Sequence, residues 1–343
     1  RHGVDKLGVR HVLADVQRIN RDESGDITSV STAAGENLEA DLFVDCTGFA
    51  SLLLGESLGV GFVDKRDVLF ADYALAAQLP YADTNTLIPS FTISTAQESG
   101  WIWDIGLSER RGTGYVYSSA HTDHDRAETV FRRYLGDDDG NLSVRKIPMR
   151  VGHRETYWQN NCVAIGLSQG FVEPLEATGI LVYDATARML ADTFPASRSV
   201  MPIVAKQFNR SVQYAWDRVI DFIKLHYCIS QRRDHSFWVD NCEASSIPET
   251  LQEKLRLWKV QPPSVYEFPS KLEIFNLANY QYVLYGMEFD TSISAEGAGR
   301  YPMLANALDR MGEISNFSDR LLGSLPEHRA LVEKIKKYGL QKI

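Results

Sequence analysis

The sequence predicts a mixed α/β (α+β) protein in which a sheet-rich first half precedes a helical second half. Short apolar or alternating runs, separated by turns rich in Gly, Asp and Asn, recur over residues 11–165. Apolar residues at helical spacing dominate from residue 180 onward. Because the character changes near residues 194–195, we expect one domain over residues 1–198 and a second over residues 199–343.

The expected strands begin with alternating patterns at residues 12–16 and 27–32. Residues 42–44 form a continuous apolar run, which is typical of a strand buried on both faces. This run ends in a turn of small residues, where Gly48 lets the backbone approach a ligand closely. Further strands are expected over residues 68–77, 90–95, 100–107, 114–119, 144–151 and 162–165.

One helix is expected within the sheet-rich half. Residues 122–125 carry a helix start signal, apolar residues follow at helical spacing, and Gly136 ends the pattern. In the second half the same spacing predicts further helices over residues 180–194, 203–228, 249–258, 302–311 and 327–337.

Composition excludes several classes of protein. The 343 residues are 44% hydrophobic and 24% charged, as in ordinary globular proteins. The net charge of −9, without a basic run, argues against a nucleic-acid partner. No apolar run approaches the roughly 18–20 residues that span a bilayer, so we expect no membrane insertion. The four scattered cysteines favour a reducing, cytoplasmic location, and no histidine has metal-site spacing.

Residues 161–183 are the most informative segment. A strand at residues 163–165 enters a small-residue turn, and Thr178 and Gly179 open an apolar helix. Backbone N–H groups at the positive end of a helix dipole suit a flavin ring, a pyrophosphate or a small anion. Glu176 stands at the edge, either as an acid, base or charge stabiliser, or as a structural cap of backbone amides.

Two other features bear on a ligand. The turns after residues 42–44 and 163–165 together favour a nucleotide-type cofactor, although no Gly-x-Gly-x-x-Gly segment is present. Trp101 and Trp103 share one face of a strand. They form either part of the core of the sheet or a wall beside a planar ligand.

Residues 40–48, 101–105 and 161–180 together resemble the flavin-dependent halogenases, the family typified by tryptophan halogenase. The likeness runs through at least residues 10–290. It implies a sheet domain of the FAD-binding, flavoprotein-monooxygenase type over residues 1–198, incomplete at the N-terminus. Residues 199–343 would then form a helical substrate-binding domain.

The resemblance also implies a reaction. FADH2 from a separate flavin reductase reacts with O2 to give a flavin hydroperoxide, which oxidises a halide ion, chloride or bromide, to hypohalous acid. That species halogenates an electron-rich aromatic substrate of the indole or phenol type. A flavin-dependent hydroxylase of the same fold and a non-catalytic scaffold stay open as alternatives, and so does the oligomeric state, a homodimer included.

The family resemblance assigns roles to individual residues. Glu176 would work with an essential lysine, and Trp101 and Trp103 would keep the substrate away from the flavin. Backbone N–H groups of Thr178 and Gly179 would hold the halide. Residues implied to bind FAD are Gly48, Gly166, Leu167, Ser168 and Ile180.

The chain departs from the family pattern in three places. The Gly-rich nucleotide turn and the lysine normally lie upstream of Arg1, and Lys6 is in the wrong segment. We therefore expect a truncated piece that neither binds FAD tightly nor turns over alone. Gly106 stands where the family motif ends in proline.

The third departure concerns the substrate. Ile274, Phe275 and Asn279 occupy the region that recognises free tryptophan in the family, and its polar partners are missing. An unpaired zwitterion in a pocket costs a few kcal/mol. A bare indole, a phenol or a larger aromatic compound is therefore the expected substrate, with these three residues in contact with it.

Overall fold

The computed structural model describes residues 2–83, 85–294, 297 and 299–340. The chain forms two compact units, each built from separated segments. Unit 1 contains residues 1–65, 150–220 and 270–274, and unit 2 contains residues 66–149, 221–269 and 275–343. The expected boundary between residues 198 and 199 falls inside unit 1, and the proposed pair of functional domains stays a prediction.

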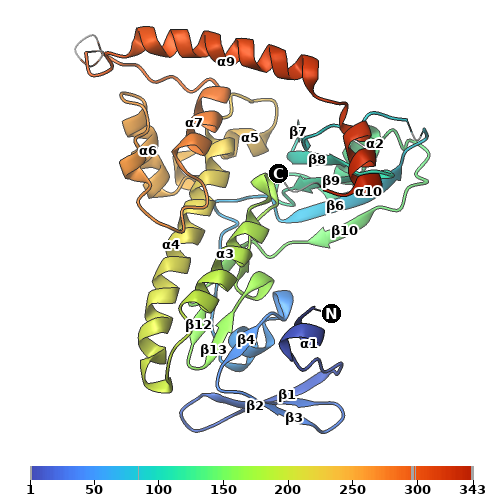
Figure 1. Ribbon diagram of the computed structural model, residues 1–343, viewed down its shortest axis with the longest axis vertical. Coiled ribbons are helices and arrows are strands. Elements are labelled where there is room, and N and C mark those ends of the chain that lie inside the picture. The colour runs from blue at the N-terminus through green and yellow to red at the C-terminus, as the bar shows by residue number, and fades with distance from the viewer. Residues whose placement is uncertain (1, 84, 295–296, 298, 341–343) are drawn as a thin grey trace. The chain divides into compact units, whose positions relative to one another are not determined.

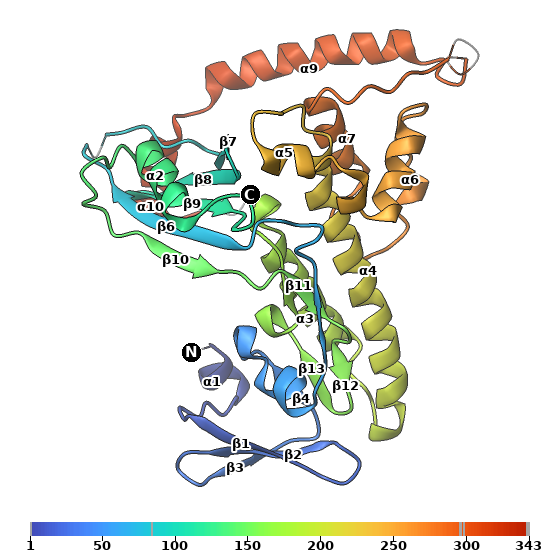
Figure 2. The same ribbon diagram turned by 180° about the vertical axis from the view of Figure 1, so that it is seen from behind.

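Unit 1 begins with helix α1 (His2–Leu7) and contains three small sheets (Figures 1 and 2). The first is antiparallel, in the order β1 (Val16–Arg21), β2 (Ile27–Thr32) and β3 (Asn37–Glu39). The second has the order β14 (Gly170–Phe171), β11 (Gly152–Arg154) and β5 (Phe62–Asp64). The third has the order β12 (Trp158–Gln159), β13 (Cys162–Ala164) and β4 (Phe43–Asp45), with β13 and β4 parallel.

Strand β13 is the middle strand of its sheet. All three of its residues are fully buried, as expected for residues 162–165. Its side chains pack on the sheet of β2 and on η2 (Leu52–Ser57), a short π-helix. The expectation that residues 42–44 are buried on both faces is wrong, because Val44 is 46% exposed. Phe43 and Asp45 on one face of β4 are buried, and the face that carries Val44 is exposed.

The strand expected over residues 12–16 is also wrong. Pairing with β2 begins only at Val16 and continues to Arg21. Leu13 is 94% exposed. The alternation before Val16 therefore does not mark a buried face, which is the physical basis of the period-2 signal.

Unit 2 is organised around an antiparallel sheet in the order β10-β6-β9-β8-β7. Its strands are β6 (Tyr73–Pro80), β7 (Ile93–Gln97), β8 (Gly100–Gly106), β9 (Arg110–Tyr117) and β10 (Arg145–Pro148). Helix α2 (His124–Leu135) packs on one face of this sheet (Figure 1). Asp123 caps its N-terminus and Gly136 ends it in the left-handed conformation, which confirms the expected bounds.

The remaining helices are α3 (Thr178–Asp192), α4 (Met201–Cys228), α5 (Ser236–Asp240), α6 (Glu249–Trp258), α7 (Leu277–Gly286), α9 (Leu304–Ser324) and α10 (His328–Tyr338). Helix α3 belongs to unit 1, and α4 continues from unit 1 into unit 2 after Ile220. Helix α9 extends well past its expected end at residue 311. Within the described ranges, no helix is both long and apolar enough to cross a bilayer.

Candidate active site

Two tight turns lie together at the carboxyl ends of the parallel strands β4 and β13 in unit 1. The N–H of Ile165 donates to the carbonyl oxygen of Asp45 at 3.0 Å. The Ser168 hydroxyl donates to the carbonyl oxygens of both Asp45 and Ile165. The two turns that the sequence predicts as ligand-facing edges are therefore neighbours, joined by hydrogen bonds.

The carboxylate of Asp45 organises the first turn. It is fully buried and accepts hydrogen bonds from the backbone N–H groups of Thr47, Leu53 and Leu54 at 2.8–3.0 Å. The hydroxyls of Thr47 and Ser51 donate to it as well. These bonds fix η1 (Gly48–Ala50) and the start of η2. The sequence predictions did not give Asp45 a role, although a carboxylate at the end of a strand before Thr-Gly was a usable signal.

Arg154 organises the second turn, η3 (Gly166–Ser168). Only 6% of this residue is exposed. Its guanidinium donates to the carbonyl oxygens of Ser168 at 3.3 Å and Val60 at 3.0 Å. Burial lowers the pKa of Arg154 from its usual value. No sequence prediction identified this arginine, because nothing in the local pattern distinguishes it from a surface residue.

The space above the two turns is open. Gly48 and Gly166 have φ angles of 71° and 80°, which explains why glycine is required at both positions. A Cβ atom at either position would meet no described atom within 4 Å. Leu167 is half-buried, and Ile180 is 76% exposed. Open backbone beside the half-buried Leu167 and the exposed Ile180 has room for a flat ring system such as a flavin.

The start of α3 is unusual. In η4 (Leu175–Ala177), Glu176 and Ala177 have φ angles of 60° and 53°, so two consecutive non-glycine residues are left-handed. This conformation costs roughly 1–2 kcal/mol per residue. Ala177 is the N-cap residue, and its side chain makes no capping hydrogen bond. Backbone N–H groups at a helix start form an anion-binding arrangement.

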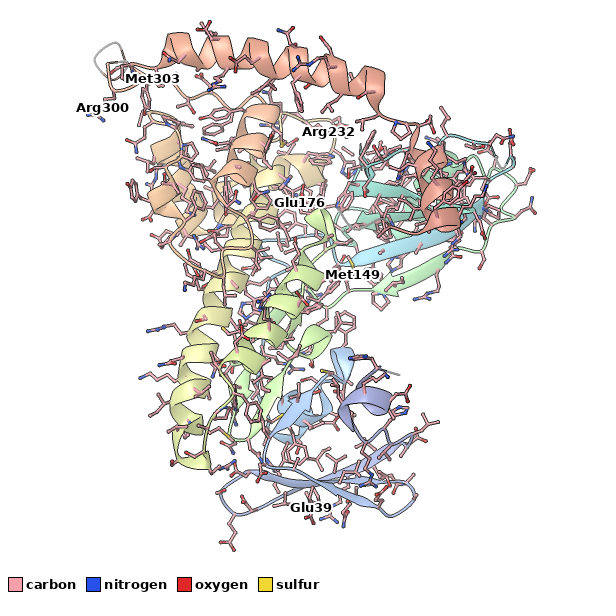
Figure 3. All side chains as sticks on the ribbon, in the orientation of Figure 1. Glu39, Met149, Glu176, Arg232, Arg300 and Met303 are labelled. Atoms are coloured by element: carbon pink, nitrogen blue, oxygen red, sulfur yellow. The ribbon has the colours of Figure 1, made fainter. Side chains whose placement is uncertain are left out.

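The two glutamates of this segment point different ways, as expected from the intervening Pro174. Glu173 is 1% exposed, whereas Glu176 is exposed at the beginning of α3 (Figure 3). The Thr178 hydroxyl donates to the carbonyl oxygen of Leu175 at 2.8 Å. That side chain is thus engaged within the turn.

Gly179 has neither a positive φ nor a crowded neighbourhood. A Cβ atom there would only touch the ring of Tyr183, at 3.5 Å or more, which is ordinary van der Waals contact. Neither backbone conformation nor packing among the described residues requires glycine at this position. A ligand that closely approaches the backbone would require glycine at position 179.

Trp101 and Trp103 lie on one face of β8 in unit 2, with ring centroids 6.3 Å apart. The opposite face carries Ile102, which is fully buried in the core beneath α2. Trp101 is 6% exposed, and its buried indole N–H has no hydrogen-bond partner among the residues described. Trp103 packs directly over Gly114, where a Cβ atom would overlap its ring.

Gly106 ends β8 in a crowded environment. A Cβ atom there would lie 2.7 Å from Cγ2 of Ile88 and 3.1 Å from the Tyr81 hydroxyl. A proline ring would need the space that these two side chains fill. The glycine at position 106, where the family motif has proline, is therefore consistent with the tight packing around it.

The three residues that are predicted to contact the substrate each have a defined place within the protein. Phe275 is 5% exposed and stacks on Phe222, with ring centroids 3.9 Å apart. The Asn279 side chain accepts a hydrogen bond from the N–H of Asn276 at 3.0 Å and caps α7. Ile274 belongs to the segment of unit 1 that ends at residue 274. Their contact with a substrate stays a prediction.

The fold and the segments around the two turns and the start of α3 indicate one family of proteins, and comparison with family models identifies it. The model of the tryptophan halogenase family matches residues 1–302, so the chain belongs to that family.

Individual relatives agree with this assignment. Over 263 residues the chain is 41% identical to tryptophan 6-halogenase SttH of Streptomyces toxytricini, covering 76% of this chain and 50% of that protein. The crystal structure of a tryptophan halogenase from Shewanella frigidimarina NCIMB 400 matches with a TM-score of 0.94 and 43% identity. That match covers 100% of this chain and 65% of the other.

A third similar protein is Tar14, a tryptophan C-6 flavin-dependent halogenase (chlorinase) from taromycin biosynthesis. Its structure matches with a TM-score of 0.89 and 36% identity, over 95% of this chain and 65% of Tar14. The chain thus spans between half and two thirds of the length of these relatives.

Proposed function

We propose that the full-length protein is an FADH2- and O2-dependent halogenase of an electron-rich aromatic substrate. The observation that carries this proposal is the start of α3, where left-handed Glu176 and Ala177 precede the first helical N–H groups and the N-cap residue Ala177 makes no side-chain cap. A helix start of this kind favours a bound halide. The family membership and the names of the relatives support the same activity.

FAD fits the residues at the two turns. Gly48, Gly166, Leu167 and Ser168, together with Ile180, would hold its ring system and adjoining groups. Reduced FAD supplies the electrons that activate dioxygen for oxidation of a halide. The protein positions the cofactor, because Asp45 and Arg154 hold the two turns in place through buried hydrogen bonds.

Backbone N–H groups of Thr178 and Gly179 would bind the halide. Because the Thr178 hydroxyl donates to Leu175, we assign the halide contact of this residue to its N–H. The exposed carboxylate of Glu176 would act with the family's upstream lysine. It would stabilise the active halogen species or accept the proton that leaves the aromatic ring.

Trp101 and Trp103 would separate the substrate from the flavin. Two large, nearly rigid rings on one strand face exclude a competing aromatic molecule and water. With direct oxygen transfer blocked in this way, halogenation is favoured over hydroxylation of the substrate.

The substrate class we propose is an indole, a phenol or a larger aromatic compound rather than free tryptophan. Asn279 is engaged in capping α7, and Phe275 is stacked on Phe222. Neither offers a charged partner for a zwitterion. A flavin reductase is the proposed transient partner, and the cytoplasm is the proposed location.

A product assay tests this proposal. The full-length protein is supplied with FAD, a flavin reductase, bromide and one aromatic compound at a time, with products analysed by mass spectrometry. Brominated indole or phenol supports the proposal, and faster bromination of free tryptophan contradicts the substrate class. If hydroxylated compounds alone are formed, the protein is a hydroxylase and the proposal fails.

Gly179→Ala tests the halide site separately. The added methyl group would make only ordinary contact with Tyr183, so we expect unchanged stability. It would stand at the backbone that approaches the halide, and we expect the KM for bromide to rise at least about tenfold, a loss of ~1.4 kcal/mol. An unchanged KM for bromide would place the halide elsewhere.

A further inference from the structure

The turn that joins β7 to β8 contains a fully buried residue, which is uncommon because hairpin turns are normally exposed. Gln97 pairs with Gly100, so the turn consists of Glu98 and Ser99. Ser99 is fully buried. A Cβ atom at Gly100 would overlap the carbonyl oxygen of Val116 in β9, so the backbone of the hairpin lies closely against its neighbour.

Ser99 is held by several hydrogen bonds. Its N–H donates to the Tyr115 hydroxyl at 3.3 Å, and its carbonyl oxygen accepts from the N–H of Ser118 at 3.0 Å. The Ser99 hydroxyl donates to the carbonyl oxygen of His121 at 3.3 Å and lies 3.4 Å from Nδ1 of His235. His235 is the N-cap residue of α5, so the turn is connected to a helix far along the chain.

Trp238 of α5 makes the most direct connection to the hairpin. Its indole N–H donates to the carbonyl oxygen of Gln97 at 2.8 Å. The residue is only 5% exposed. Its ring packs on Phe237 and Tyr227, and the guanidinium of Arg232 lies 4.9 Å from the ring centroid. The position of the indole is therefore well determined.

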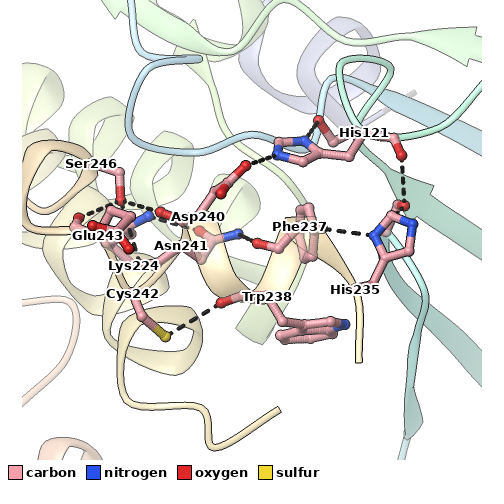
Figure 4. Close-up of polar contacts among 12 residues, drawn as sticks. His121, Lys224, His235, Phe237, Trp238, Asp240, Asn241, Cys242, Glu243 and Ser246 are labelled. Carbon is pink, nitrogen blue, oxygen red and sulfur yellow. Dashed lines mark hydrogen bonds and ion pairs between the residues drawn. The ribbon is translucent and has the colours of Figure 1, made fainter. Parts of the chain in front are cut away.

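Helix α5 is itself fixed at its far end (Figure 4). Nε2 of His121 lies 3.1 Å from a carboxylate oxygen of Asp240, and the Ser118 hydroxyl lies 2.8 Å from Nδ1 of His121. The ammonium group of the fully buried Lys224 donates to the Asn241 side chain at 2.7 Å. The helix cannot shift without breaking these contacts.

Displacement of the hairpin turn would move the two tryptophans. Trp101 directly follows Gly100 and pairs with Ala96, and Trp103 pairs with Ser94. In an antiparallel hairpin the position of the turn fixes the register of these pairs. The bond from Trp238 to Gln97 is thus one residue away from the Trp101 pair.

We propose that Trp238 is a positioning residue that holds the β7–β8 turn, and through it the Trp101–Trp103 pair, in place. Its consequence for catalysis rests on the proposed function. There, the held pair keeps the substrate away from the flavin, so that oxygen activation leads to halogenation rather than hydroxylation. Trp238 itself touches neither substrate nor cofactor in this role.

Trp238→Phe tests the proposal, because phenylalanine keeps an aromatic ring and removes the N–H donor. Trp258→Phe is the matched control. It also removes a buried indole N–H bond in unit 2, at 2.9 Å to Glu267, but at the end of α6. Hydrogen exchange is measured over residues 97–103, and halogenated product is measured per FADH2 consumed, both in the full-length protein.

For Trp238→Phe we expect exchange over residues 97–103 to become about tenfold faster, because a buried acceptor loses its donor. Halogenated product per FADH2 should fall at least about twofold. Trp258→Phe should change neither quantity. Because free FADH2 also reacts with O2 in solution, the ratio is measured in single turnovers with the protein in excess over FADH2, and the folded fraction of each variant is checked by circular dichroism.

Equal exchange in the wild type and Trp238→Phe, or the same product ratio in both variants, would overturn the proposal. If the wild type forms no halogenated product, the proposed function fails instead. The exchange measurement then still decides whether Trp238 holds the hairpin.

Discussion

Replacing Gly114 by alanine tests whether β9 leaves room for the Trp103 ring. A Cβ atom at this position would lie 2.1 Å from Cζ2 of Trp103 and 2.7 Å from the carbonyl oxygen of Leu75. Carbon atoms in contact are about 3.5–4.0 Å apart, so the ring must retreat by roughly 1.4 Å or more. Strand β9 cannot move away, because it is paired with β6 on one side and β8 on the other.

Overpacking of this kind costs about 1–3 kcal/mol. We therefore expect Gly114→Ala to lower the free energy of unfolding by that amount in denaturant titrations. The near-ultraviolet circular dichroism of the indoles should change as well, since the two rings are 6.3 Å apart and inclined by 60°. In the full-length protein, the share of hydroxylated product should increase as the barrier opens.

Gly112→Ala is the matched control on the same strand. A Cβ atom at Gly112 would meet no described atom within 4 Å, so the same chemical change has no steric consequence. Equal stability and equal product ratios for Gly112→Ala and Gly114→Ala would refute the packing argument.

Two other substitutions test the turns and the start of α3. Glu176→Gln should reduce halogenation by at least about a hundredfold, the usual scale for a positioned acid–base group, while FAD binding measured by fluorescence is unchanged. Full activity of this variant would leave Glu176 with a structural role only. Asp45→Asn should lower the free energy of unfolding by about 1.5–3 kcal/mol, because buried N–H groups lose a charged acceptor. Stability equal to the wild type would show that the charge of the Asp45 carboxylate does not contribute to stability.

Elements with a regular period and clear end signals could be predicted from the sequence. Helix α2 has an Asp123 cap and a Gly136 stop, and α6 has a continuous amphipathic pattern, so their bounds were found within two residues. Helix α5 was missed because its five residues are too few to establish a period. Strand β1 was placed too early, because alternation in an exposed segment looks the same as alternation on a buried face.

The parts of the candidate site that depend on residues adjacent in sequence could be predicted. The turn at Gly166 and the helix start at Thr178 follow from neighbouring residue types. The bonds from Arg154 to Val60 and from Trp238 to Gln97 join residues about 100 positions or more apart. No local pattern encodes such a pair. Left-handed Ala177 was equally unpredictable, because alanine itself favours the right-handed region.

The interleaving of the two compact units limits how this protein can be recombined with its relatives. The five-stranded sheet and helix α5 come from residues 66–149 and 221–269, and the intervening residues 150–220 belong to the other unit. A chimaera with a single crossover between these segments would join a hairpin from one parent to a supporting helix from another. Grafts that exchange both segments together would keep native partners.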